Sequence, residues 1–290
     1  MSGVTTQDIS DEIKRRWSIS SAFFLADTPS SIVHRVTLKD GSPAILKRLK
    51  PRGIGELPGM TFLEWRDGHG AVRILQKKDT DCLLEDAGDL TLRTYRLQHG
   101  EDAANAIICE VIQKLHAPGK APHGELTPLA QHFRSLFART EIEASERLQE
   151  PLRYCAEITR ELLAHQETPR PLHGDLHHDN IVTGGARGWL AIDPQGLIGD
   201  PAYDVANIFG NPLNALPEIV DPQRIKRLCD IFSETLGCAK EKVLRYAIAH
   251  AGVSICWSLD DGGDLDGNEN ALERLAFLTV ARDLLNDLNP

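Results

Sequence analysis

The chain has 290 residues, of which 41% are hydrophobic and 26% charged, a composition typical of a soluble globular protein with about two domains or lobes. Acidic residues outnumber basic ones by 42 to 32, and the formal net charge is −10. Such a surface repels phosphate backbones, so nucleic acid is not the expected partner and a cationic small molecule is favoured.

No part of the sequence predicts export or membrane insertion. Residues 1–17 are charged rather than apolar, and no window approaches the ~20 apolar residues that a membrane span needs. The six cysteines are scattered without a CxxC pair, which indicates reduced thiols. We therefore expect a cytoplasmic protein without a membrane partner, and the sequence carries no information on oligomeric state.

Residues 1–86 are predicted to form a small, mainly antiparallel sheet with one helix. Two apolar, β-branched runs, Ile32 to Leu38 and Ala44 to Leu49, flank a connection that contains Asp40-Gly41. An Asp-Gly between such runs favours a β-hairpin. Three further elements are predicted: a helix around Phe62 to Arg66 and strands from Ala71 to Leu75 and from Cys82 to Leu84.

Residues 87–290 are predicted to form a larger, mainly helical lobe. One predicted helix, residues 102–116, carries an apolar face at a period of 3.6, made of Ile107, Ile108, Val111, Ile112 and Leu115. Further amphipathic helices are predicted in residues 154–165, 222–237, 240–259 and 271–288. Residues 171–200 form a non-helical island among them. The expected fold class is therefore α+β, with a sheet lobe followed by a helical lobe.

The sequence HGDLHHDN lies in this island and carries the candidate chemistry. Two short apolar runs, residues 180–183 and 189–192, flank a Gly-rich turn, which predicts a second hairpin. That hairpin would bring Asp175 and Asn180 close to Asp193. Oxygen ligands of this kind suit Mg²⁺, and the H-x-D-x-x-x-x-N spacing with a later Asp is the pattern of kinase catalytic loops.

HGDLHHDN followed by IDPQGLIGDPAYDVANI resembles the motifs of the kinase-like antibiotic phosphotransferases, and most closely the streptomycin-type aminoglycoside and hydroxyurea phosphotransferase family. The resemblance covers nearly the whole chain, through PAILKRLK, EWRDGHGAVRIL and CLLEDAG upstream. It implies a protein-kinase-like fold with ATP and Mg²⁺ in the cleft between the lobes. It also implies transfer of the γ-phosphoryl group to a hydroxyl of a small, polar or cationic acceptor such as an aminoglycoside.

The resemblance implies roles for residues of both lobes. Asp175 would be the catalytic base that orients or deprotonates the acceptor hydroxyl. Asn180 and Asp193 would hold the Mg²⁺ ions that bridge the β- and γ-phosphates. Lys47 would contact the α- and β-phosphates, held extended by a pairing with Glu64. Phosphoryl transfer asks a protein mainly for positioning and charge neutralisation, and these residue types supply both.

Further implied contacts lie at the nucleotide's two ends. The backbone of Glu85, Asp86 and Ala87 would receive the adenine at the interlobe hinge. The Gly-rich loop of protein kinases is absent, so Ser30 and Ser31 would cradle the phosphates in its place. DPQG replaces the usual DFG, and its proline stiffens the turn, so no Phe switch is expected. No activation segment is recognisable, which favours a small acceptor over a protein substrate.

Several polar residues have structural interpretations beside the functional ones. His173 is expected to orient the catalytic loop through hydrogen bonds. His177 and His178 are adjacent, so in an extended segment one would face the substrate and the other solvent. Zinc is disfavoured because no HxxxH or Cys partner is in register. Asp200 is expected to cap the next helix and Asp204 to brace the catalytic loop, with substrate contact as the alternative for both.

The lysine and its partner also have alternatives. Lys47 in LKRLK would be an ordinary solvated lysine were it not for the downstream motifs. Asp67 lies one turn beyond Glu64 and could compete for the same role.

The acidic stretch DDGGDLDGNENALE resembles a calcium loop. It fits the pattern at Asp264 and Asp266, but Gly262 stands where the first carboxylate is required. The favoured interpretation is a polar loop in which Asn268 or Asn270 caps the following helix. An acidic rim that attracts a cationic acceptor is the alternative.

Three functions are compatible with these motifs. The first is phosphorylation of an aminoglycoside, and the second is phosphorylation of a sugar or amino alcohol by the same machinery, because fold resemblance does not choose between acceptors. The third is a non-catalytic nucleotide-binding module. Each residue type that the chemistry needs is present, from Lys47 through Asp193, which disfavours the third.

Overall fold

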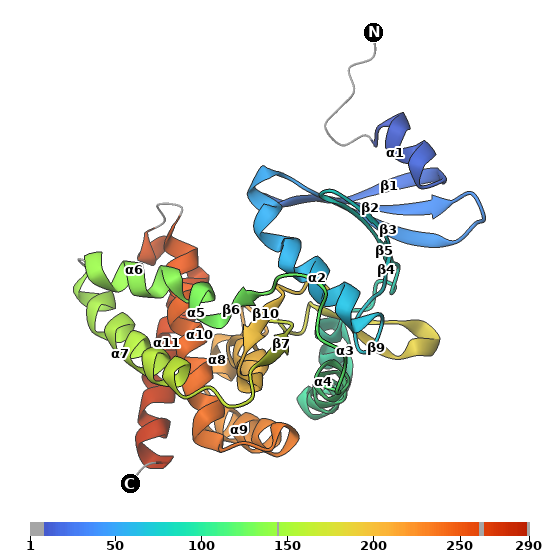
Figure 1. The fold of residues 1–290 in the computed structure, drawn as a ribbon. Helices are drawn as coiled ribbons and strands as arrows, with labels where there is room; N and C mark the ends of the chain where they lie inside the picture. Colours follow the sequence, from blue (N-terminus) through green and yellow to red (C-terminus); the bar gives the residue numbers. More distant parts are fainter. Residues whose placement is uncertain (1–8, 144, 261–263, 289–290) are drawn as a thin grey trace.

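The first lobe contains a five-stranded antiparallel sheet of strand order β1-β2-β3-β5-β4 (Figure 1). The structure, a computed structural model, describes residues 9–143, 145–260 and 264–288. The strands of this sheet are β1 (Ile19–Asp27), β2 (Ser31–Leu38), β3 (Pro43–Leu49), β4 (Ile74–Lys78) and β5 (Asp81–Glu85).

The predicted β-hairpin is confirmed by β2 and β3. Val36 pairs with Ala44, and the connection turns at Gly41, whose φ of +88° is a conformation that glycine adopts without strain. The strand predicted from Cys82 to Leu84 is confirmed by β5. The strand predicted from Ala71 to Leu75 corresponds to β4, which begins only at Ile74, and Ala71 instead forms an isolated bridge to Ala191. β1 was not predicted, since its residues are mostly exposed and show no apolar alternation.

One helix covers each face of this sheet (Figure 1). Successive strand residues point to opposite faces, so Leu83 packs in a small core with Ile13 of α1 (Asp11–Arg16). Its neighbour Leu84 belongs to the main core, together with Leu63 of α2 (Leu57–Arg66). α2 therefore lies between the sheet and the rest of the chain.

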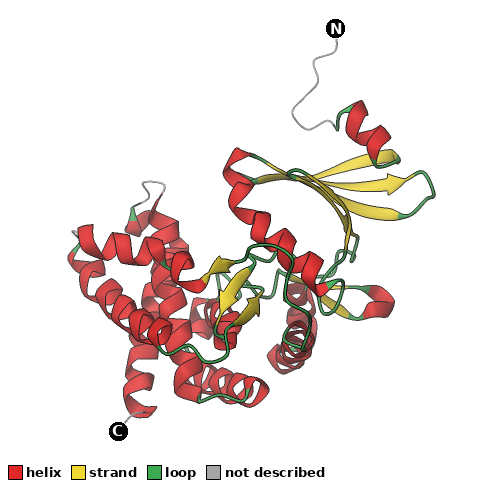
Figure 2. Cartoon of the chain, in the orientation of Figure 1, coloured by secondary structure: helices red, strands yellow, loops and turns green. Residues whose placement is uncertain are grey.

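The remainder is mainly helical, as expected, and is built around α10, which is buried along most of its length (Figure 2). α10 packs on α7, α11 and the 3₁₀ helix η3. The helices are α3 (Leu92–His99), α4 (Glu101–Leu115), α5 (Leu129–His132), α6 (Arg134–Ile142), α7 (Glu146–Ala164), α8 (Leu216–Ile219), α9 (Pro222–Leu236), α10 (Lys240–Asp260) and α11 (Glu269–Leu288). The 3₁₀ helices of this part are η2 (Gly185–Arg187), η3 (Pro201–Gly210) and η4 (Leu265–Gly267), whereas η1 (Pro51–Glu56) lies in the first lobe between β3 and α2.

Short strands lie between the sheet and the helices (Figure 2). β8 (Ile181–Thr183) and β9 (Trp189–Ala191) form the second predicted hairpin. A three-stranded sheet joins β6 (Thr127–Pro128), β10 (Leu197–Gly199) and β7 (Arg170–Leu172). Within the described ranges, no helix is long and apolar enough to cross a membrane.

Candidate active site

A cleft of about 260 Å³ lies between the five-stranded sheet and the β8–β9 hairpin. Strand residues of the sheet form one wall, the segment after β5 forms the back, and residues of the hairpin form the other wall. The apolar lining residues are Leu25, Val33, Ile45, Val72, Leu84, Ala87, Val182 and Ile192. The charged lining residues are Arg35, Lys47, Glu85, Asp86, Asp89, Asp179 and Asp193.

Lys47 connects the two walls of the cleft. Its ammonium lies 3.0 Å from a carboxylate oxygen of Asp193 and 2.7 Å from one of Glu56. Burial opposes the charged form of this lysine, but the two carboxylates outweigh that effect and raise its pKa. Lys47 is therefore a fixed cation at the mouth of the β8–β9 hairpin.

The predicted pairing of Lys47 with Glu64 is wrong. Glu64 is exposed and its carboxylate lies 3.1 Å from the ammonium of Lys77. Glu56 precedes Glu64 by eight residues, about 12 Å along a helix at 1.5 Å per residue, so only one of them can reach Lys47. The sequence carried one signal for the position of Glu56. Pro58 lies in the first turn of α2, and because proline favours helix starts, it indicates that Glu56 lies at the N-terminus of this helix.

Glu85, Asp86 and Ala87, the predicted hinge residues, all line the back of the cleft. Glu85 accepts a hydrogen bond from the backbone N–H of Arg73 and pairs with Arg187. The carboxylate of Asp86 lies 2.6 Å from Arg35, a residue that the sequence did not single out. The two acidic side chains are thus neutralised by neighbouring cations.

Ser30 and Ser31 are not among the residues that line this cleft, and their phosphate-cradling role stays a prediction. Ser31 is buried, and its N–H donates to the hydroxyl of Thr28 at 2.9 Å. The hydroxyls of both serines also lie within hydrogen-bond distance of that of Thr28. The two serines close the β1–β2 turn, so the N–H of Ser31 and both hydroxyls have partners within the turn.

Asp175 lies in the predicted catalytic loop, residues 173–180. Its carboxylate accepts hydrogen bonds from the side-chain amides of Asn207 at 2.8 Å and Asn180 at 3.2 Å. Burial raises the pKa of Asp175 to about 7, although these two hydrogen bonds act in the opposite direction. The structure thus brings the predicted base and Asn180 into direct contact.

Asn180 and Asp193 lie next to each other at the base of the β8–β9 hairpin. The N–H of Ile192 donates to the carbonyl of Asn180 at 2.9 Å, which places Asp193 beside it. Asn180 uses its amide nitrogen for both hydrogen bonds to Asp175, so its oxygen is turned away from that residue. Asp193 has a φ of +53°, and its carboxylate is half exposed in the cleft. An amide oxygen and a carboxylate fit Mg²⁺, which usually takes one or two protein carboxylates plus phosphate oxygens.

His173 and Asp204 hold the catalytic loop in place. The ring of His173 accepts from the N–H of Asp175 and donates to the carbonyl of Ile192 at 2.9 Å. The buried carboxylate of Asp204 accepts from the N–H of Gly174 at 2.7 Å and lies 2.7 Å from the ring of His116. The predicted structural roles of His173 and Asp204 agree with these contacts, whereas His116 was not predicted.

His177 and His178 do not alternate between substrate and solvent, which corrects that expectation. His178 is completely buried, and His177 is half-buried with its ring 3.9 Å from Asp175. The N–H of Asn180 bonds the carbonyl of His177, so the segment is a turn and the alternation of an extended strand does not apply. Burial lowers the pKa of His177 to about 4 and that of His178 to about 3.

The remaining polar predictions concern helix starts. Asp200 caps η3 by accepting from the N–H of Ala202 at 3.0 Å, as expected. Asn268 accepts from the N–H of Ala271, which confirms the capping interpretation of the acidic loop. Asp266 pairs with Arg147, and Gly262 lies outside the described residues.

The fold was compared with solved structures. A thermostable mutant of an aminoglycoside phosphotransferase, in a ternary complex with ADP and hygromycin B, is similar with a TM-score of 0.65 at 15% identity, over 93% of this chain and 97% of that one. This likeness confirms the protein-kinase-like fold. Within this kinase-like fold, Lys47 contacts Asp193 and Asp175 contacts Asn180, which lies beside Asp193.

The sequence comparisons identify the family. The model of the aminoglycoside/hydroxyurea antibiotic resistance kinases matches residues 16–262. The streptomycin 3''-kinase of Klebsiella pneumoniae is 38% identical over 93% of this chain and 99% of its own length. The streptomycin 6-kinase of Streptomyces glaucescens is 28% identical over 87% of this chain and 82% of its own. The chain belongs to the aminoglycoside/hydroxyurea antibiotic resistance kinase family.

Proposed function

We propose that the protein transfers the γ-phosphoryl group of ATP, in the presence of Mg²⁺, to a hydroxyl of an aminoglycoside of the streptomycin type. The observation that carries the proposal is the contact between Lys47 and Asp193, which joins the sheet to the catalytic hairpin beside Asp175 and Asn180. The names of the relatives support the acceptor class, because two of them are streptomycin kinases.

The nucleotide would lie in the cleft between the sheet and the hairpin. The apolar side chains of Val33, Ile45 and Val182 suit the two faces of a planar base. Lys47 would bind the α- and β-phosphates, and the position of its ammonium at the mouth of the hairpin, between two carboxylates, supports this role. The segment after β5 would provide the backbone groups that receive the adenine edge.

Asn180 and Asp193 would hold Mg²⁺, which when bound neutralises charge on the β- and γ-phosphates. Asp175 would receive the proton of the acceptor hydroxyl while the hydroxyl oxygen forms a bond to the γ-phosphorus. The bond from that phosphorus to the β–γ bridging oxygen breaks, and ADP leaves. Asn207 and Asn180 keep the Asp175 carboxylate in one orientation for this transfer.

The acceptor would be cationic, in keeping with the net charge of −10. We also infer a cytoplasmic location, where ATP is present, and a lobe boundary after residue 86, directly beyond the end of β5.

The test is ADP release with Mg·ATP in the presence of streptomycin, other aminoglycosides, hydroxyurea, a sugar or an amino alcohol. Stimulation by streptomycin supports the proposal, and stimulation by a metabolite alone would instead assign a metabolite kinase. Asp175→Asn should lower turnover by about 10²–10⁴-fold, the range for loss of general base catalysis, while ATP binding persists. Asp283→Asn, an exposed change of the same kind on α11, is the control. Unchanged turnover in Asp175→Asn would remove this residue as the base.

A further inference from the structure

Arg35 joins the five-stranded sheet to the segment at the back of the nucleotide cleft. It lies on β2, and its guanidinium contacts two carboxylates at once. Its Nε and one Nη bond the carboxylate of Asp86 at 2.6 and 3.2 Å, and its two Nη atoms bond that of Asp89 at 2.6 and 3.1 Å. Each nitrogen of the guanidinium therefore has a carboxylate partner, which holds the planar group in one orientation.

The two carboxylates differ in how strongly they can hold the arginine. The side chain of Asp86 is 8% exposed, and its carboxylate also accepts from the N–H of Gly88 at 3.0 Å. The side chain of Asp89 is 80% exposed. Exposed ion pairs contribute little, because water and salt screen them. Asp86 is therefore the main anchor of the guanidinium, and Asp89 is the weaker one.

Both carboxylates belong to a segment, residues 86–91, that is fixed to the opposite wall of the cleft. The N–H of Thr183 in β8 donates to the carbonyl of Leu90 at 3.0 Å. Thr91 forms an isolated antiparallel bridge to Val182, which lines the cleft on the hairpin side. The guanidinium therefore connects β2 to the β8–β9 hairpin through this segment.

The position of Arg35 in the sheet places this connection beside the residues proposed to face the base. Arg35 pairs with Ile45 across β2 and β3, and it follows Val33 by two residues on the same face of the sheet. Atoms on each face of a flat ring attract it best at about 3.5–4.0 Å, and a gap of about 0.5–1 Å already loses a quarter to a half of that attraction. Affinity for a base between these residues and Val182 therefore depends on how closely the two walls are held together.

We propose that Arg35 is a positioning residue for the base of the nucleotide, because it holds β2 against residues 86–91 and so sets the spacing of the two apolar walls. This inference rests on the proposed function, since it takes the cleft to be the nucleotide site. The role differs from that of Lys47, whose contact with Asp193 spans the cleft at the end proposed for the phosphates.

The experiment measures the two ends of the nucleotide site separately. A fluorescent ATP analogue is displaced from the protein either by adenosine or by tripolyphosphate with Mg²⁺, and each inhibition constant is corrected for the affinity of the analogue itself. Arg35→Gln should weaken adenosine binding about tenfold, the loss expected for a charge-assisted interaction, and leave tripolyphosphate binding unchanged. Lys47→Gln should do the opposite.

The anchors and a conservative variant refine the test. Asp86→Asn should weaken adenosine binding nearly as much as Arg35→Gln does, and Asp89→Asn should weaken it less. Arg35→Lys keeps the charge but not the fork that bonds two carboxylates, so it should show an intermediate loss. It also provides the same comparison should Arg35→Gln not fold, which urea denaturation would reveal.

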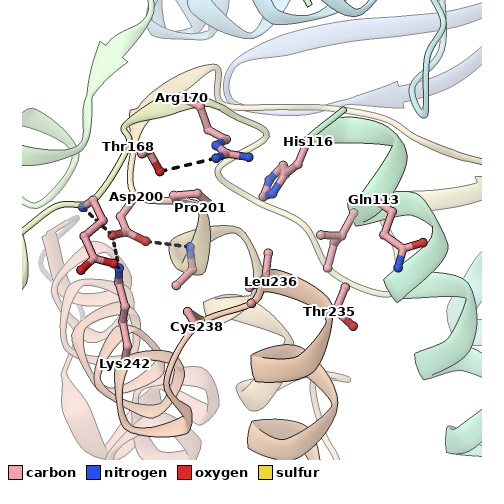
Figure 3. Close-up of a pocket in the computed structure, with 14 residues that line it drawn as sticks. Gln113, His116, Thr168, Arg170, Asp200, Pro201, Thr235, Leu236, Cys238 and Lys242 are labelled. Atoms are coloured by element: carbon pink, nitrogen blue, oxygen red, sulfur yellow. Dashed lines mark hydrogen bonds and ion pairs between the residues drawn. The ribbon is translucent and has the colours of Figure 1, made fainter. Parts of the chain in front are cut away.

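Arg170→Gln is the matched control. Arg170 is likewise a half-buried arginine of a strand, β7, and its guanidinium lies 3.5 Å from the hydroxyl of Thr168. It lines a second pocket, of about 170 Å³, that shares no lining residue with the nucleotide cleft (Figure 3). Its replacement should therefore leave the affinities for adenosine and tripolyphosphate unchanged.

Two results would overturn the inference. Equal adenosine affinity in Arg35→Gln and the unchanged protein would show that Arg35 does not set the spacing of the walls. Equal losses for adenosine and tripolyphosphate would show general damage to the sheet instead of an effect on the base. If the unchanged protein binds no adenosine and releases no ADP, the proposed function fails as well. If it does both and Arg35→Gln binds adenosine normally, only the role of Arg35 fails.

Discussion

The side-chain amide of Asn207 donates to the carboxylate of Asp175 at 2.8 Å. Asn207 lies three residues after Asp204 in η3, and residues i and i+3 of a 3₁₀ helix lie on the same side. η3 therefore holds the catalytic loop at two points, since Asp204 binds the loop's backbone and Asn207 binds the proposed base. The amide oxygen of Asn207 accepts from Arg274 at 3.3 Å and from Asn211 at 2.9 Å, which fixes the orientation of the amide.

Replacing Asn207 should therefore affect turnover more than nucleotide binding. Asn207→Ala removes a hydrogen bond to a charged group, worth about 1.5–3 kcal/mol, so we expect kcat to fall about tenfold or more. The KM for ATP should be unchanged, because Asn207 does not line the nucleotide cleft. Steady-state kinetics of this variant beside Asn286→Ala, an exposed asparagine of α11, measures both quantities. A rise in KM for ATP with unchanged kcat would show that Asn207 does not act through Asp175.

A second prediction compares the KM for ATP of variants at Glu56 and Glu64, with the Glu64 variant as the control. Glu56→Gln removes a charge-assisted partner of Lys47, so the KM for ATP should rise about tenfold. Glu64→Gln breaks only an exposed pair with Lys77, and exposed pairs contribute about 0–1 kcal/mol, so its kinetics should be nearly those of the unchanged protein. Measured KM values that reverse this order would restore Glu64 as the partner of Lys47 in the working enzyme.

The parts of the fold that the sequence predicts are those with a local pattern. The β2–β3 hairpin follows from Asp40-Gly41 between two apolar runs, and the long helices follow from a 3.6-residue period. The β8–β9 hairpin follows in the same way, and it places Asn180 beside Asp193. The core of the candidate site was therefore predictable from short-range features and motif spacing.

The parts that were missed depend on contacts between distant segments. β1 is largely exposed, so it lacks the alternation that reveals a half-buried strand. Asn207 and His116 belong to η3 and the end of α4, and only the folded chain brings them to the catalytic loop. His178 was misjudged because a turn replaces the extended segment for which alternation holds.

The contact between α2 and the turn after Asp193 leads to a prediction about glycine. A Cβ added at Gly59 would lie 1.9 Å from the carbonyl oxygen of Pro194, a distance that backbone atoms cannot tolerate. Gly59→Ala should therefore push α2 away from this turn, lower the free energy of unfolding by about 1–3 kcal/mol and reduce kcat. Gly55→Ala meets no atom within 4 Å and should leave both nearly unchanged. Urea denaturation and kinetics of the two variants test this, and equal effects would argue against a close contact of α2 with the turn.

Stability in acid should depend on His132. Its ring contacts the hydroxyl of Tyr203 at 2.6 Å, and burial lowers its pKa from 6.5 to about 4. Between these two values the unfolded chain binds a proton that the folded protein does not, so the free energy of unfolding falls as pH falls from 6.5 to 4. Below pH 4 both states are protonated and this contribution levels off. The full loss from this residue is about 3 kcal/mol, at 1.36 kcal/mol per pKa unit.

Urea denaturation of the unchanged protein and of His132→Gln at several pH values between 7 and about 4 measures that slope. The glutamine variant should be less stable at neutral pH, because the contact with Tyr203 is altered, yet its stability should decline less steeply toward acid. His123→Gln, an exposed histidine outside any helix or strand, should keep the slope of the unchanged protein. Parallel slopes in all three proteins would mean that His132 is protonated equally easily in the folded and unfolded states, and that the acid sensitivity arises from other groups.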